Sequence, residues 1–137
     1  MSPANQPIEQ IVADGVTLAY IIRHDVDPPK TNFVTPDAAN FQAGFIVYPA
    51  GSEIARHIHK PIHRELNGTS EVLLLRKGRC EVDFFTQAKE LVATRELRAG
   101  DVLLLLAGGH GFRVIEDITF LEIKQGPYTG LDEKERF

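Results

Sequence analysis

Residues 51–78 read GSEIARHIHKPIHRELNGTSEVLLLRKG, and this stretch decides how the chain is interpreted. Its centre is His57-Ile58-His59. Successive side chains of a strand point to opposite faces, so histidines at positions i and i+2 lie side by side on one face. Such a pair suits a metal ion, although two polar residues on a solvated strand give the same pattern. A carboxylate at Glu71 and a third histidine at His110 favour the metal.

Together, His57, His59, Glu71 and His110 supply three imidazoles and one carboxylate. This set suits a divalent transition metal ion such as Fe, Mn, Ni, Co or Zn, and it suits Ca or Mg poorly. With four protein ligands, an octahedral ion keeps two open positions for water or substrate. A Lewis acid or an oxygen-activating centre needs that arrangement.

The composition indicates one ordinary globular domain over residues 1–137, with 43% hydrophobic and 25% charged residues. A net charge of -4 and the lack of a basic stripe argue against a nucleic-acid partner. The longest apolar run, Val102–Ala107, is too short to span a bilayer, so no membrane partner is expected. Cys80 has no second cysteine to pair with, and the first ten residues lack the regions of a signal peptide. We therefore expect a cytoplasmic protein.

Short β-favouring runs follow one another along the chain, separated by turn signals. The links are too short for crossover helices, which predicts an all-β fold, an antiparallel sandwich or barrel. The expected strands are Val16–Ile22, Phe45–Tyr48, Ile54–His59, Val72–Leu75, Cys80–Phe85, Leu91–Leu97, Val102–Leu106, Phe112–Ile115 and Thr119–Lys124. The expected turns include Asn67-Gly68, Lys77-Gly78, Gly108-Gly109 and Glu116-Asp117.

Three segments carry more specific patterns. Residues 80–84 alternate between apolar and charged, which predicts one buried and one wet face. Residues 102–106 are apolar throughout, which predicts a strand covered on both faces. Residues 23–43 are polar and contain three prolines, which predicts a surface excursion such as a lid or an intersubunit arm.

These features resemble the cupin superfamily. Its first motif, G-x5-H-x-H-x3-4-E-x6-G, is similar to residues 51–78, where Gly51 precedes the HxH pair and Glu71 precedes Gly78 at the usual spacings. Its second motif, G-x5-P-x-G-x2-H, is similar to residues 100–111. The two cover roughly 60 of the 137 residues. The resemblance implies an antiparallel jelly-roll barrel (double-stranded β-helix) with His57, His59, Glu71 and His110 as metal ligands.

The chain departs from the family pattern in three places. Eleven residues, KPIHRELNGTS, separate His59 from Glu71, where the family has three or four. Leu106 replaces the proline of the second motif, and His110 arrives one residue early. The long connection leaves Glu65 and His63 open as substitute ligands. We favour Glu71 over Glu65 because Glu71 keeps its distance to the turn glycine, and we expect His63 at the mouth of the site.

Several side chains near these motifs are expected to bind substrate. Cations flanking the HxH pair suit an anionic group such as a carboxylate or a phosphate, and they also suit a solvated strand edge. Arg113 follows His110 by three residues and shares its face if the strand begins at Gly111. The candidate substrate-binding residues are Lys60, His63, Arg64, Tyr48 and Arg113.

The resemblance implies a metal-dependent enzyme acting on a sugar or a sugar nucleotide, as isomerases and epimerases of this superfamily do. A histidine then serves as acid or base rather than as a ligand. An Fe(II)-dependent dioxygenase and a non-catalytic ligand-binding or sensing cupin remain the alternatives, because the superfamily contains all of these. Exposed strand edges in a small barrel favour association, and a homodimer is expected.

Overall fold

The computed structural model describes residues 6–130 and 133–137. Internal contacts divide the chain into two units. The first, here called the sheet unit, comprises Met1–Val26 and Thr69–Phe137, and the second, the arm unit, comprises Asp27–Gly68. Each unit is described by itself.

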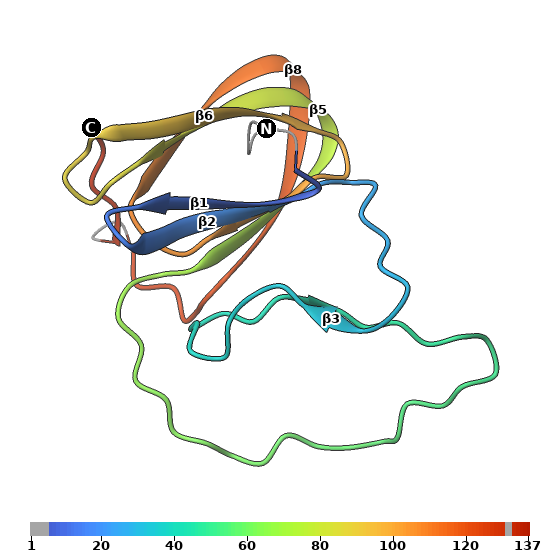
Figure 1. The fold of residues 1–137 in the computed structure, drawn as a ribbon. Coiled ribbons are helices and arrows are strands. Elements are labelled where there is room, and N and C mark those ends of the chain that lie inside the picture. The colour runs from blue at the N-terminus through green and yellow to red at the C-terminus, as the bar shows by residue number, and fades with distance from the viewer. Residues whose placement is uncertain (1–5, 131–132) are drawn as a thin grey trace. The chain divides into compact units, whose positions relative to one another are not determined.

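The sheet unit is one strongly curled antiparallel sheet (Figure 1). Its strands run in the order β1-β2-β7-β5-β6, and β8 pairs with β5. No α-helix occurs among the described residues, so the expected all-β, antiparallel class is confirmed. The strands are β1 (Ile8–Ala13), β2 (Val16–Ile22), β5 (Glu71–Phe85), β6 (Leu91–Arg98), β7 (Val102–Leu105) and β8 (Gly109–Lys124).

The first hairpin was not expected from the sequence. β1 pairs with β2 through a two-residue connection, Asp14-Gly15, whose φ angles are 52° and 74°. Two consecutive residues with positive φ match the twist of the flanking strands, and Asp-Gly is a preferred pair for this turn. The dipeptide therefore carried a signal for a strand on each side.

β5 and β8 form one long bent ribbon, where four short strands were expected. The predicted turns at Lys77-Gly78 and Glu116-Asp117 are wrong, because both lie within these strands and the register shifts between Leu75 and Cys80. Gly78 has a φ of 84°, and a Cβ there would come within 2.0 Å of the Asp117 carbonyl oxygen. Only glycine fits this close approach, so its backbone bends the strand instead of ending it.

The core lies on the concave face of the curled sheet. Cys80, Val82 and Phe84 are buried on it, as the alternation predicted, and the three leucines of β7 are all buried, as the apolar run predicted. The core residues are Ile11, Leu18, Ala19, Ile21, Leu73, Leu75, Cys80, Val82, Phe84, Leu97, Leu103 and Leu105.

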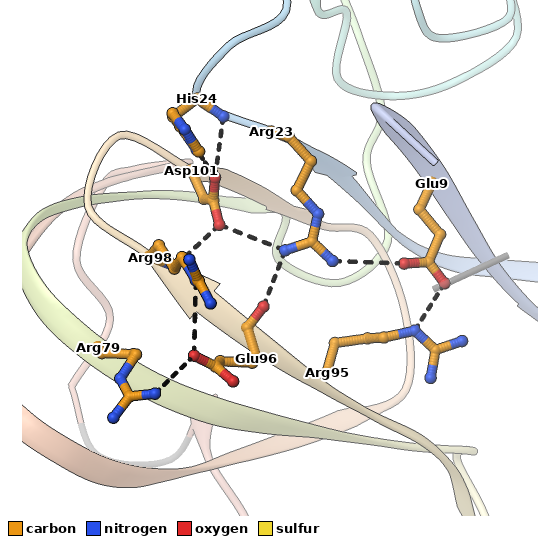
Figure 2. A network of polar contacts seen from close by, with 8 residues as sticks. All are labelled: Glu9, Arg23, His24, Arg79, Arg95, Glu96, Arg98 and Asp101. Carbon is orange, nitrogen blue, oxygen red and sulfur yellow. Dashed lines mark hydrogen bonds and ion pairs between the residues drawn. The ribbon is translucent and has the colours of Figure 1, made fainter. Parts of the chain in front are cut away.

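A buried ion pair links the two ends of the strand order. Glu9 of β1 is opposite Ile21, and Arg95 of β6 is opposite Val82, so both side chains project from the core face. Nε of Arg95 donates to Oε2 of Glu9 at 2.7 Å, and only 1% of Glu9 is exposed. Arg23 lies 3.7 Å from the other oxygen of Glu9. Side-chain charges, not a backbone ladder, therefore connect β1 to β6 (Figure 2).

A second buried carboxylate fixes the end of β2 to the turn before β7. Asp101 accepts hydrogen bonds from the backbone N–H groups of His24 and Arg98, each at 2.8 Å. Arg23 donates to the same carboxylate at 3.3 Å and to the carbonyl oxygen of Glu96 at 2.8 Å (Figure 2). These contacts anchor the point at which the chain leaves the sheet.

The arm unit contains little regular structure. β3 (Asn32–Phe33) pairs with β4 (Gly44–Phe45), and residues 46–68 contain neither strand nor helix. The strand expected over Ile54–His59 is therefore wrong, and that over Phe45–Tyr48 is reduced to its first residue. Charged side chains interrupt the first of these runs, and Pro61 after it has no N–H to donate to a ladder. The polar excursion expected over residues 23–43 lies largely within a longer segment, Asp27–Gly68.

Replacing Glu9 by glutamine should destabilise the protein strongly. The change leaves the Arg95 guanidinium without its buried counter-charge, which typically costs about 3 kcal/mol or more of unfolding free energy. Arg23 loses one of the two carboxylates beside it and keeps Asp101. Urea unfolding followed by circular dichroism measures the loss. Gln10→Ala, on the exposed side of the same strand, is the control and should stay within about 0.5 kcal/mol of the wild type. A Glu9→Gln variant as stable as this control would contradict the role of the ion pair.

Candidate functional site

Two of the four expected metal ligands meet on the concave face of the sheet. Glu71 begins β5 opposite the core residue Leu105, and His110 is the second residue of β8, opposite the core residue Phe84. The curl of the sheet brings Nε2 of His110 within 4.0 Å of Oε1 of Glu71. The two side chains are only 28% and 15% exposed. Residues of two separate stretches of the sequence thus come together.

Glu122 joins this pair, and the sequence analysis missed it. In the β5–β8 register Glu71 is opposite Lys124 and Leu73 is opposite Glu122, so the two glutamates are diagonal neighbours on one face. Burial, followed by the hydrogen bond and the charge of Glu122, raises the pKa of Glu71 to about 7. The same hydrogen bond lowers the pKa of Glu122. Glu71 therefore holds the proton and donates it to the Glu122 carboxylate.

The imidazole beside them is neutral near pH 7. Burial is the main cause that lowers the pKa of His110, and the positive charge of Lys134 lowers it further, while Glu122 acts in the opposite direction. The cluster therefore combines a protonated carboxyl, a carboxylate and an unprotonated imidazole in one partly buried place. Acid–base catalysis requires a proton donor and a proton acceptor, and the pKa of about 7 for Glu71 lies near the pH at which such a donor works best.

The histidine pair lies in the arm unit. The rings of His57 and His59 are 5.4 Å apart between centroids and meet edge to face, although no strand holds them. Nδ1 of His57 lies 2.8 Å from the carbonyl oxygen of Ala55. A carbonyl only accepts, so Nδ1 donates this hydrogen bond, which leaves Nε2 as the ring nitrogen that can bind a metal. Metal-binding histidines are commonly oriented by such a bond.

The four expected ligands are thus divided between the two units, two in each. At metal–ligand distances of about 2.1 Å, two ligand atoms are about 3 Å apart when adjacent and about 4 Å when opposite. The 4.0 Å between His110 and Glu71 lies within that range. Across residues 6–130 and 133–137, no three side chains of His, Cys, Asp or Glu are already grouped to hold a metal.

The substitute ligands are engaged with each other. Nε2 of His63 lies 3.5 Å from Oε1 of Glu65, and both side chains are largely exposed. Gly78 lies inside β5 and does not form a turn, so its distance from Glu71 does not distinguish Glu71 from Glu65. The position of Glu71 on the concave face beside His110 now distinguishes the two carboxylates.

Of the expected substrate-binding residues, four lie in the arm unit and one in the sheet unit. Tyr48, Lys60, His63 and Arg64 are exposed there. Arg113 does not share the face of His110, because β8 begins at Gly109 and residues three apart in a strand lie on opposite faces. Its guanidinium instead binds the carboxylates of Asp83 and Glu81 on the outer face.

Cys80 has the environment of a packing residue. Its side chain is fully buried in the core, and that burial, followed by the charge of Asp101, raises the pKa of the thiol. A reactive cysteine needs the opposite, a lowered pKa and access to solvent. The thiol therefore packs as a small apolar group.

Comparison of the chain with protein-family models, with curated proteins and with solved structures finds no match. Across its described residues, the chain has no helix of the length and hydrophobicity needed to cross a membrane.

Replacing Glu71 by glutamine should stabilise the chelator-treated protein at alkaline pH. A carboxyl whose folded-state pKa is raised from 4.5 to about 7 favours folding below pH 4.5, and this contribution is lost as the pH rises through 7. Glutamine stays neutral, so Tm should rise by a few degrees at pH 8 and change little at pH 5. The control Glu90→Gln, at an exposed site, should show no pH-dependent difference. Equal effects of Glu71→Gln at both pH values would contradict the raised pKa.

Proposed function

We propose that the chain is a cupin that acts on a small molecule of the sugar or sugar-nucleotide type as an isomerase or epimerase. The observation that carries the proposal is the 4.0 Å approach of His110 to Glu71 on the concave face of a curled antiparallel sheet. These two residues are 39 positions apart in the chain and belong to the two motifs that resemble the cupin pattern.

The fold supports this proposal at the coarse level. A curled, all-antiparallel sheet whose long β5–β8 ribbon contributes to both of its halves is consistent with a jelly-roll barrel. We also propose that the protein is a homodimer in the cytoplasm, and the support for the dimer is a free edge of the sheet.

One edge of β8 pairs with β5, and within the described residues no strand pairs with the other edge. Proteins commonly cover such an edge by association.

The residues of the cluster suit proton transfer between adjacent carbons. Unprotonated His110 accepts a proton from the carbon beside a carbonyl, and protonated Glu71 returns one to the neighbouring oxygen or carbon. Glu122 holds the Glu71 proton through a hydrogen bond and keeps that carboxyl oriented.

A divalent transition metal fits the donor set of this proposal. With a metal bound, His57, His59, Glu71 and His110 would serve as its ligands, and His110 and Glu71 would then not act as base and acid. In His57 the ligand atom would be Nε2, because Nδ1 is hydrogen-bonded to the carbonyl oxygen of Ala55. When bound, such an ion acts as a Lewis acid that polarises a substrate carbonyl.

Metal titration tests the ligand set. Wild-type protein treated with chelator and titrated with Co²⁺ should bind one ion per chain, followed by visible absorption and elemental analysis. His57→Ala and His59→Ala should each weaken binding at least about tenfold, since each removes one ligand. His63→Ala is the matched control from the same segment and should bind as the wild type does. Loss of binding in His63→Ala with retention in Glu71→Ala would exclude the proposed carboxylate.

Deuterium incorporation tests the chemistry. Incubated in D₂O with nucleotide-linked keto-deoxysugars, the wild-type protein should introduce deuterium at the carbon beside the carbonyl, followed by NMR. His110→Gln and Glu71→Gln should slow the exchange by about 10²-fold or more, because each removes one acid–base group. Glu90→Gln should exchange at the wild-type rate. Exchange that is unaffected by both site variants, or absent from the wild type across the panel, would contradict the proposal.

A further inference from the structure

The last residues of the chain lie beside the candidate site. Residues 133–137, here called the C-terminal strap, contact the rest of the sheet unit through both the first and the last residue of the strap. Oε1 of Glu133 lies 3.5 Å from Oγ1 of Thr69, which is two residues before Glu71. At the other end the Phe137 ring lies beside Gly109, where an added Cβ would come within 2.9 Å of Cζ. Gly109 immediately precedes His110.

Two further contacts hold the last residues in place. The Phe137 ring meets the Phe85 ring edge to face, with 5.1 Å between centroids. Nζ of Lys89 lies 2.6 Å from Oε1 of Glu135 and 5.8 Å from the centre of the Phe137 ring. One lysine of the β5–β6 connection thus binds the strap through an ion pair and a cation–π contact.

The strap therefore has one contact near each member of the Glu71–His110 pair. Lys134, between the two anchored glutamates, is close enough for its charge to act on Glu71, His110 and Glu122. The low exposure of Glu71 and His110 agrees with a cover at this place. The contacts of the strap are one aromatic pair and exposed polar pairs, which contribute little free energy each and open readily.

We propose that the C-terminal strap is a lid over His110 and Glu71, held shut by Phe137 and by the Lys89–Glu135 ion pair, which opens to admit a ligand. The lid adds a gating step to the proposed function. It rests on the proposed function only for the identity of the ligand that enters. The strap itself can be tested without substrate or metal.

Chemical modification of His110 measures the opening. Diethyl pyrocarbonate reacts with unprotonated imidazoles, and peptide mass spectrometry gives the rate at each histidine of the full-length protein. Phe137→Ala should raise the rate at His110 about fivefold or more. The rates at the exposed His57, His59 and His63 should not change, and they serve as internal references.

Charge reversal supplies a second test at exposed positions that do not threaten folding. Lys89→Glu and Glu135→Lys should each raise the His110 rate about twofold to fivefold, and the double variant should return it close to the wild-type rate. Unchanged His110 rates in all of these folded variants would overturn the lid. So would an increase in the single variants that the double variant does not reverse. Failure of metal binding or of deuterium exchange would leave these rates unaffected, so the two proposals fail separately.

Discussion

The buried ion pair between Glu9 and Arg95 is the contact on which the shape of the sheet unit depends. Because β1 and β6 share no backbone hydrogen bonds, the two ends of the strand order are held by side chains that project over the core. Burying two charges is favourable only with close geometry and additional partners, which Arg23 helps to supply. The curl that the ion pair maintains also encloses the concave face on which His110 approaches Glu71.

Most strands of the sheet unit were predictable from the sequence, because alternating or continuous apolar runs report burial directly. Errors occurred at dipeptides with glycine, which can form either a turn between two strands or a bend inside one strand. Lys77-Gly78 reads as a turn, but the partner strand passes so close to Gly78 that the glycine forms a bend inside β5. Asp14-Gly15 was the opposite case, a short dipeptide that carried the β1–β2 hairpin and was overlooked. The difference between a bend and a turn depends on a strand far away in the chain.

The candidate site was predictable to the extent that motifs specify it. Motif spacing predicted that Glu71 and His110 belong to one site, and the fold brings the two side chains within 4.0 Å of each other. Glu122 could not be predicted from the sequence, because it becomes a neighbour of Glu71 only through the β5–β8 register, which no local pattern encodes. Arg113 was placed on the wrong face because β8 was taken to begin at Gly111, which leaves His110 outside the strand. β8 begins two residues earlier, at Gly109, so both residues belong to it. Residues three apart in a strand lie on opposite faces.

β5 pairs with strands of both halves of the sheet, and this pairing affects how the sheet unit unfolds. Its first residues, Glu71–Leu74, lie between β7 and β8, while its later ones, Arg79–Phe85, lie between β6 and β8. Neither half of the sheet can lose its central strand without exposing core side chains of the other half. Denaturation of the sheet unit is therefore a single cooperative event, with no stable species in which one half persists alone.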